Sequence, residues 1–354
     1  MTRSRKGLFM LRRTPLTLTA LLALLALLAP GVAAARKVTV KLATLAPKGT
    51  AYHDILSEMA AEWKDLSDGQ VQVKIFPGGV AGDDVNVVRK MRLGTVSGGL
   101  LTSAGVATIH KAIHGVILPM GYKSRAELDY VFDKMRPTLE AAYAQEGFVV
   151  LNWVSVGFVR FFTKEKAATP EELQKMKLFT WAGREEALAM WKAAGFNPVP
   201  LPSTEISTGL QTGLIDALPT TPQAANLMNW YTHVGYMIDE PWAPLVGGTV
   251  ISKEVWEQID PALRAKLAES ARKAGEKLNA ASRPANQNAI DAMTKRGLQL
   301  VKLTAEQRAD WAKRVEAAYP MFRETYAPGP YFDEALKHRD AFRKLGGFTD
   351  GAAE

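Results

Sequence analysis

The order of hydrophobic and polar residues near the start of the chain predicts alternating strands and helices. Residues 38–42 and 71–76 alternate apolar and polar side chains, which is the period of a strand with one buried face. Between them, residues 52–63 carry apolar side chains at the spacing of an amphipathic helix. A second helix is expected at 85–93, with Asp83 at its N-cap. This order indicates an α/β fold on an open sheet.

The same alternation returns in the middle of the chain. Apolar runs at 149–154, 158–163 and 177–181 predict strands, and residues 184–194 predict a helix that Gly195 ends. A chain of 354 residues is long enough for two domains of ordinary size. We therefore expect a second α/β unit after the first.

The last third of the chain is expected to be helical. Apolar positions at helical spacing run from residue 261 to residue 297, behind a cap at Asp260. Pro284 lies inside this run and should kink or split the helix. Another amphipathic helix is expected at 307–326.

The first 35 residues have the pattern of an export signal. Five basic residues and no acid occur within residues 1–13, an apolar stretch follows at 16–29, and small residues occupy 32–35. The apolar stretch is shorter than the roughly 20 residues that a membrane-spanning helix needs. We predict cleavage near Ala35 and a periplasmic product, with retention of the leader as a membrane anchor as the alternative.

Charge and cysteine content exclude several classes of function. The net charge of +8 falls to +3 once the five basic residues of the leader are left out, so the basic balance does not imply a nucleic-acid partner. The chain has no cysteine, which excludes disulfides, thiolate nucleophiles and thiolate metal sites.

Three motifs point to a known family. Residues 169–173 read Thr-Pro-Glu-Glu-Leu, residues 195–200 read Gly-Phe-Asn-Pro-Val-Pro, and residues 205–216 read Glu-Ile-Ser-Thr-Gly-Leu-Gln-Thr-Gly-Leu-Ile-Asp. In these motifs the chain resembles the DctP-type substrate-binding proteins of tripartite ATP-independent periplasmic (TRAP) transporters. The resemblance extends from residue 38 to about residue 300.

The resemblance implies a two-lobed α/β periplasmic binding protein fold, with a hinge, a central ligand cleft and a long helix that spans both lobes. On this chain the first part of lobe I corresponds to 36–155, lobe II to 156–245, and the return to lobe I to 246–260. The lobe-spanning helix corresponds to 261–297, and C-terminal helices that pack on the lobes to 298–354. Such proteins close on their ligand by hinge motion.

The resemblance also implies a function without catalysis or cofactor. It predicts a solute receptor that binds a small organic ligand and delivers it to TRAP-type membrane permease subunits. A periplasmic carrier or sensor of the same fold that serves a non-TRAP partner is one alternative, and a periplasmic enzyme is another. An enzyme would need a nucleophile–base pair or a metal cluster, and the sequence contains neither pattern. His110 and His114 could share a helix face, but no neighbouring acid completes a metal site.

At its ligand-binding motifs the chain departs from the family. Where the family reads Lys-Ile-Arg-Val, with an arginine that clamps the ligand carboxylate, residues 177–180 place Phe179 at the arginine position. A second family arginine, in a Gly-x-Arg-x-x-Thr motif, corresponds to Arg160 followed by Thr163. Where the family usually reads Asp-Gly-Gln-Glu-Asn-Pro, residues 216–222 read Asp-Ala-Leu-Pro-Thr-Thr-Pro, so the amide and the acid are replaced and the stretch contributes Leu218 and Thr220. We therefore expect a ligand that is more apolar or less acidic than a C4-dicarboxylate; the alternative is an ordinary organic acid held by Arg160.

The candidate ligand-binding residues each have a plainer alternative. Trp153, Trp181 and Phe162 are expected at the cleft, although large aromatic side chains are often core. Glu205 and Asp83 are candidates that could instead begin or cap helices. The full set of candidates is Arg160, Phe179, Trp181, Trp153, Phe162, Glu205, Leu218, Thr220 and Asp83.

Overall fold

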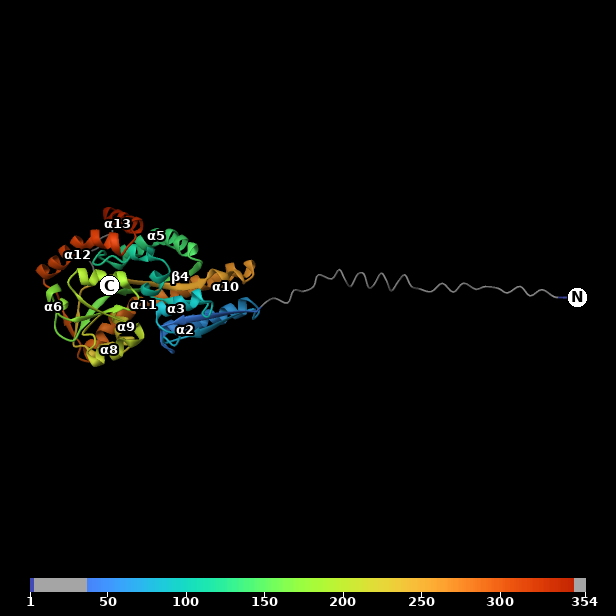
Figure 1. Cartoon of the computed structure of the whole chain (residues 1–354), viewed down its shortest axis with the longest axis horizontal. Helices are drawn as coiled ribbons and strands as arrows, with labels where there is room; N and C mark the ends of the chain where they lie inside the picture. The colour runs from blue at the N-terminus through green and yellow to red at the C-terminus, as the bar shows by residue number, and fades with distance from the viewer. Residues whose placement is uncertain (3–36, 347–354) are drawn as a thin grey trace. The chain divides into compact units, whose positions relative to one another are not determined.

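The computed structural model describes residues 1–2 and 37–346 of the chain (Figure 1). Apart from its first two residues, the predicted leader lies outside the described residues, so cleavage near Ala35 stays a prediction. Within 37–346, no helix is both long enough and apolar enough to cross a bilayer.

Lobe I is built on a five-stranded sheet in the order β2-β1-β3-β10-β4. Its strands are β1 (Val38–Thr44), β2 (Val71–Phe76), β3 (Gly98–Leu101), β4 (Phe148–Phe158) and β10 (Pro244–Ser252). β1 runs parallel to β2 and β3, whereas β10 is antiparallel to β3 and β4. Its helices are α2 (Ala51–Leu66), α3 (Asp84–Arg92), α4 (Ser103–Ile109), η1 (Lys111–Gly115), α5 (Arg125–Gln145) and α10 (Lys253–Glu257).

The first strand, β1, contributes side chains to two separate apolar clusters of lobe I. Val40 and Leu42 of β1 pack with Leu56 and Trp63 of α2 in one cluster. Ala43 belongs to the other cluster, which includes the buried face of α5. Successive side chains of a strand point to opposite faces, so β1 anchors a helix layer on each side.

Lobe II contains a six-stranded sheet in the order β11-β9-β5-β8-β6-β7. Its strands are β5 (Arg160–Thr163), β6 (Lys177–Trp181), β7 (Asn197–Leu201), β8 (Ala217–Thr220), β9 (Tyr236–Ile238) and β11 (Gln299–Val301). Its helices are α6 (Pro170–Gln174), α7 (Glu185–Ala193), η2 (Ser203–Glu205), α8 (Ile206–Thr212), α9 (Pro222–Leu227) and η3 (Trp230–His233). β6 runs parallel to both β7 and β8, so the carboxyl ends of these three neighbours lie at one edge of the sheet.

The chain passes between the two sheets where strands change partners. Pairing of β4 with β10 continues to Phe158 and Pro244, and β5 begins with Arg160, so the first crossing is at Val159. The return crossing lies between Ile238 and Pro244. The lobe boundaries proposed from sequence, at residues 155 and 245, do not coincide with these crossings. The pairing of β4 with β10 continues beyond residue 155.

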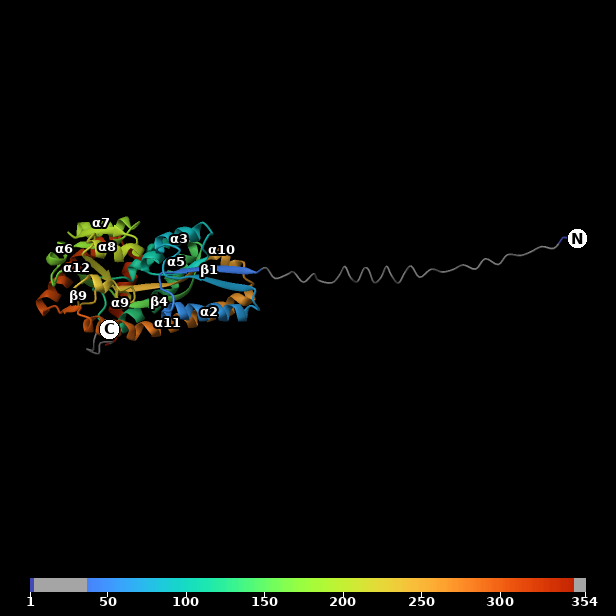
Figure 2. The same ribbon diagram turned by 90° about the horizontal axis from the view of Figure 1, so that it is seen from below.

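One helix, α11 (Pro261–Lys295), contacts both lobes. It packs against α2 and β4 of lobe I and against α9 of lobe II, and Figure 2 shows it beside α2. The helix continues through Pro284.

Two asparagines of α11 form hydrogen bonds with the backbone of β4. Asn279 Nδ2 donates to the Trp153 carbonyl at 2.9 Å, and Asn286 Nδ2 donates to the Val156 carbonyl at 2.7 Å. Two further helices, α12 (Ala305–Thr325) and α13 (Gly329–Lys344), end the described chain.

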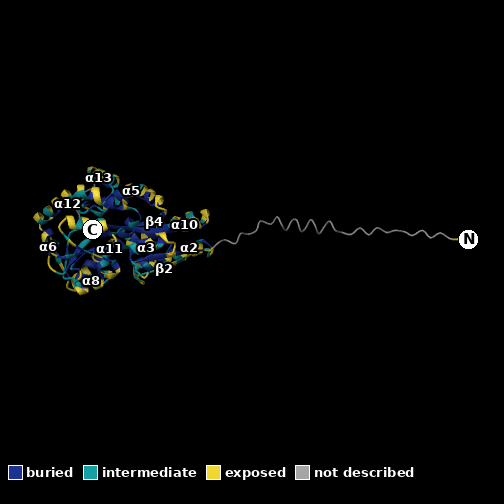
Figure 3. Ribbon diagram, viewed as in Figure 1, coloured by how far each residue is buried: buried dark blue, intermediate teal, exposed yellow. Residues whose placement is uncertain are grey.

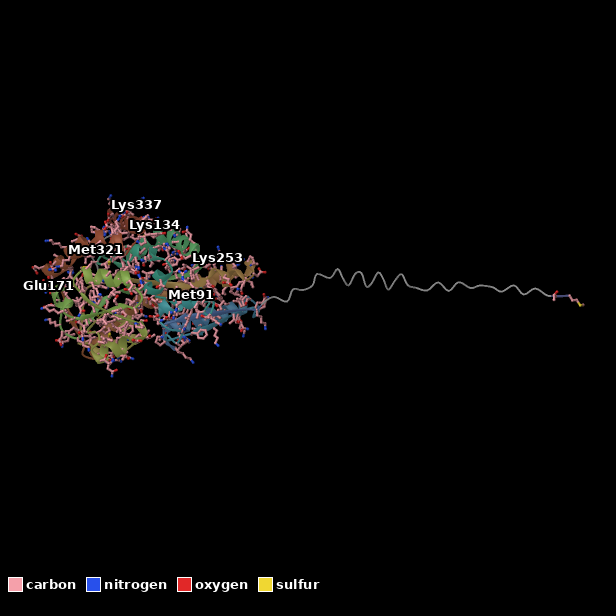
Figure 4. The ribbon with its side chains drawn as sticks, in the orientation of Figure 1. Met91, Lys134, Glu171, Lys253, Met321 and Lys337 are labelled. Carbon is pink, nitrogen blue, oxygen red and sulfur yellow. The ribbon has the colours of Figure 1, made fainter. Side chains whose placement is uncertain are left out.

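Burial follows the layers of the fold. The strands are mostly buried, and exposed residues gather on the outer sides of the helices (Figure 3). Charged side chains such as Lys134, Lys253 and Lys337 lie at the surface (Figure 4). Two α/β lobes joined by crossing strands and a shared helix confirm the predicted fold class.

Candidate functional site

A cleft of about 300 Å³ lies between the two lobes. Lobe I contributes Thr44, Leu45, Ala46, Pro47, Tyr52, Gly78, Leu100, Leu101, Thr102, Val154, Val156, Leu245 and Gly247. Lobe II contributes Phe179, Trp181, Ser203, Thr204, Ile206, Ser207, Leu218, Pro219, Thr220, Gln223, Ala224, Leu227, Met228 and Trp230. Val159, at the first crossing, completes the wall.

None of the described residues that line this cleft has a charged side chain. The polar side chains among them are hydroxyls, one carboxamide and indole N–H groups. A cleft of this composition can bind a ligand by apolar contact and neutral hydrogen bonds. It offers no cation to pair with a carboxylate.

Four of the residues predicted from sequence meet in this cleft. Phe179 and Trp181 lie on β6, with ring centroids 4.9 Å apart and an edge-to-face angle of 67°. Leu218 and Thr220 lie on the neighbouring strand β8. Phe179 and Leu218 are fully buried and belong to one apolar cluster of lobe II.

Two predicted aromatic residues lie in the lobe cores instead. Phe162 is fully buried in the same lobe II cluster as Phe179 and does not line the cleft. Trp153 packs edge-to-face on Phe132 and Tyr143 in lobe I. Its Nε1 donates to Glu140 Oε1 at 3.2 Å, so both the ring and the N–H of the indole have partners within lobe I.

Arg160 lies on the side of the chain facing away from the cleft. Its Nε is 3.4 Å from Asp239 Oδ1, and it lines a separate polar cavity that also includes Glu240. Burial lowers the pKa of Arg160, against the opposing effect of the acids Asp239 and Glu240. The preceding residue, Val159, faces the cleft because adjacent residues of an extended chain point in opposite directions.

Gly157, Arg160 and Thr163 do not fit the spacing of the second family motif together. Counted back from Thr163, the motif arginine falls on Arg160, but counted forward from Gly157 it falls on Val159. The chain has one residue more than the motif between these two ends. The structure puts Val159 in the cleft wall and Arg160 in the separate polar cavity.

Neither of the two predicted acids lines the cleft. Asp83 is buried and caps α3, with its carboxylate accepting from the Asn86 backbone N–H at 2.9 Å. Glu205 is exposed at the end of η2 and is absent from the cleft wall.

Several wall residues were not predicted, among them Tyr52 and Thr102. The Tyr52 hydroxyl group hydrogen-bonds Ser282 of α11, and burial raises the pKa of Tyr52. Thr102 Oγ1 donates to Asp84 Oδ2 at 2.6 Å, and burial raises the pKa of Asp84 to about 6. Tyr52 sits at a core-like position of its helix, so the hydrophobic pattern does not indicate its role.

The two lobes touch at the edges of the cleft. The Gly79 backbone lies against Thr204, because a Cβ at Gly79 would come within 3.0 Å of that side chain. On the other side, Arg184 of lobe II donates to the Ala104 carbonyl at 3.1 Å and hydrogen-bonds His114. The cleft is therefore held in a closed form.

The histidines of lobe I have structural partners. His110 Nδ1 accepts from the Ala112 backbone N–H at 3.1 Å, and His114 stacks on Tyr326 at 3.9 Å. Across residues 37–346, no three His, Asp or Glu side chains are grouped to hold a metal ion.

Comparison with known proteins gives this geometry a family. Residues 42–325 match the family model of DctP, the bacterial extracellular solute-binding proteins of family 7. Over 255 residues, which are 71% of this chain and 74% of the other, the sequence is 24% identical to the 2,3-diketo-L-gulonate-binding periplasmic protein YiaO of Escherichia coli.

Solved structures show the same fold. The sugar acid binding protein DctPAm of Advenella mimigardefordensis, in complex with galactonate, has a TM-score of 0.80 at 18% identity and covers 86% of this chain and 99% of its own. A TRAP periplasmic solute-binding protein of Citrobacter koseri, with bound D-glucuronate, has a TM-score of 0.76 at 22% identity and covers 85% and 98%.

Family and fold are those of solute-binding proteins that serve transport rather than of enzymes. The family match spans most of the chain and includes both lobes and α11. The protein therefore belongs to the DctP family of bacterial extracellular solute-binding proteins.

Proposed function

We propose that this protein is a periplasmic receptor that captures a small, uncharged and largely apolar solute and delivers it to TRAP-type membrane permease subunits. Its family and its structural relatives support the receptor role and the type of partner. The observation that carries the ligand class is the absence of charged side chains among the described residues of the cleft wall.

This ligand class departs from the relatives, whose names give sugar acids as ligands. A carboxylate buried in the present cleft would lose its hydration without gaining a cation, which is unfavourable. An apolar solute gains roughly 25 cal/mol per Å² of surface that the wall removes from water. Val159 and Phe179 supply such surface at the two positions where the family motifs carry arginine.

The size of the cleft limits the solute. About 300 Å³ is at the lower end of the range for small-molecule sites, so the ligand should be a compact molecule. Closure of the lobes around it would give the membrane partner a form that differs from the empty receptor.

The proposal can be tested by introducing an arginine side chain into the cleft wall. Phe179→Arg and, separately, Val159→Arg each place a guanidinium at a family arginine position. Each variant should bind a neutral apolar solute at least about tenfold more weakly and should gain affinity for D-galactonate or succinate, because a guanidinium pairs with a carboxylate. Isothermal titration calorimetry measures both changes.

The unmodified protein is the reference for this experiment. It should bind neutral apolar solutes and leave galactonate, D-glucuronate and succinate unbound at millimolar concentration. Micromolar binding of any of these acids by the unmodified protein would refute the proposed ligand class. It would leave the family and the receptor role intact.

A further inference from the structure

Three buried polar atoms in the cleft have no hydrogen-bond partner among the described residues. They are Trp181 Nε1, Ser203 Oγ and Gln223 Oε1. A buried donor or acceptor left unpaired is costly, so native proteins usually give such atoms a partner. All three side chains belong to residues of the cleft wall.

The fold places these three side chains at one edge of the lobe II sheet. Trp181 ends β6 and pairs in register with Leu201, the last residue of the parallel strand β7. Ser203 follows Leu201 by two residues, and Gln223 follows β8, the other parallel neighbour of β6. Carboxyl ends of neighbouring parallel strands meet at one edge, which is where open α/β sheets bind ligands.

The polar groups on the lobe I side of the cleft are engaged within the protein. Thr44 Oγ1 accepts from the Ala46 backbone N–H at 3.1 Å, Thr102 Oγ1 donates to Asp84, and the Tyr52 hydroxyl bonds Ser282. The remaining lobe I wall is largely aliphatic. The ligand's polar end therefore belongs at the lobe II edge, with its apolar body toward lobe I.

The unpaired atoms differ in what they require. An indole Nε1 can only donate, a carboxamide oxygen can only accept, and a hydroxyl can do either. In Gln223 the amide oxygen is the atom without a partner. The ligand group must present an acceptor to Trp181 and a donor to Gln223.

We infer that the ligand carries a neutral group with both a hydrogen-bond acceptor and a hydrogen-bond donor, of the carboxamide class, held by Trp181, Ser203 and Gln223. This inference rests on the proposed function, since it names the polar end of the same apolar solute. A carboxylate offers acceptors only and would direct negative charge at the Gln223 oxygen. These three residues thus favour an amide over the acid of the same shape.

The test uses three probes that share one apolar body: phenylacetamide, phenylacetate and propylbenzene. Calorimetric titration of the exported protein should give the amide at least about tenfold tighter binding than the acid, and tighter binding than the hydrocarbon. Trp181→Phe keeps a ring and removes the N–H, so it should weaken the amide about three- to tenfold and leave propylbenzene unchanged.

Two further variants keep this result interpretable. Ser203→Ala should weaken the amide in the same direction with little effect on folding. Trp191→Phe is the matched control, because Trp191 lines a separate apolar cavity of about 430 Å³ beside α7 and α12, and it should leave all three affinities unchanged.

The outcomes separate the two proposals. Equal binding of amide and propylbenzene, with no effect of Trp181→Phe, would overturn the inference and leave the apolar receptor standing. Absence of amide binding up to millimolar concentration would also overturn the inference. Tightest binding of phenylacetate would overturn the proposed function itself.

Discussion

Val159, Phe179 and Leu218 give the cleft wall its apolar character at positions where the family motifs place charged or polar residues. Each exchange alone would alter one contact with a ligand. With the second motif counted from Gly157, they replace two arginines and an amide. This wall is the basis of the proposal that the solute is uncharged.

Arg160 gives the clearest prediction about a single side chain. Because it pairs with Asp239 away from the cleft, Arg160→Ala should leave ligand affinity within about twofold of the unmodified protein. It should lower the free energy of unfolding by about 1 kcal/mol through loss of the partly buried ion pair. Calorimetry and urea denaturation measure these quantities, and a tenfold loss of affinity would show that Arg160 contacts the ligand.

His114 makes stability depend on pH. Burial, together with Arg184 and Lys111 nearby, holds the pKa of His114 well below its usual value, so the ring is neutral in the folded protein. In the unfolded chain it takes up a proton near pH 6.5. Unfolding is therefore favoured as pH falls below about 6.5, and the full contribution to stability is present above it.

Substitution isolates this contribution. His114→Gln removes the titrating ring and keeps an acceptor for Arg184, so the stability of the unmodified protein relative to the variant should decline between pH 8 and pH 5. Urea denaturation at a series of pH values measures the difference. A difference that stays constant with pH would contradict a neutral buried His114.

Among the elements, the crossing strand β4 and helix α11 are in close contact at Gly157. Gly157 has φ of +115°, and a Cβ there would lie 2.3 Å from Asn286 Nδ2. Asn286 holds the Val156 carbonyl of β4 and accepts from the Gln223 backbone N–H of α9 at 3.1 Å. A side chain at Gly157 would thus disturb the link between the lobes.

Gly157→Ala should cost about 2–3 kcal/mol in the free energy of unfolding, from the positive φ and the displaced Asn286 together. Gly297→Ala is a matched control, since Gly297 has φ of +105° but a Cβ added there would meet no atom within 4 Å. The control should cost only the backbone part, about 1 kcal/mol. Equal costs in chemical denaturation would show that the contact with Asn286 does not matter.

In the first and middle parts of the chain, the hydrophobic pattern predicted the elements β1, α2, β2, α3, β4, β5, β6 and α7. Strands β3 and β10 are among the elements that it did not predict. Both contain paired glycines instead of an alternating pattern. A Cβ at Gly98 would lie 2.4 Å from the Val250 carbonyl oxygen, and one at Gly247 would lie 2.0 Å from that of Leu101. Close approach of these backbones requires glycine, and this removes the signal that identifies a strand.

The sequence predicted only part of the candidate site. Phe179 and Leu218 follow family motifs at a fixed spacing, so their place in the cleft could be predicted from sequence. Arg160 could not be placed, because one extra residue after Gly157 reverses which side chain faces the cleft. Gln223 and Tyr52 enter the wall from segments whose neighbours in space only the folded chain defines.

At the scale of the whole molecule, the closed cleft depends on contacts made by both lobes. The Gly79 loop meets Thr204 on one side, and Arg184 reaches Ala104 and His114 on the other. α11 packs against elements of both lobes, and the chain crosses between the lobes at Val159 and between Ile238 and Pro244. A solute bound in this form is enclosed by wall atoms, so its charge determines whether closure is favourable.

The central claim, an uncharged ligand, is tested most directly by identifying what the protein carries. Native mass spectrometry of the protein purified from the periplasm gives the mass of the complex, and denaturation releases the bound molecule for identification. We expect a compact neutral molecule with an apolar body. A bound sugar acid or dicarboxylate would contradict it.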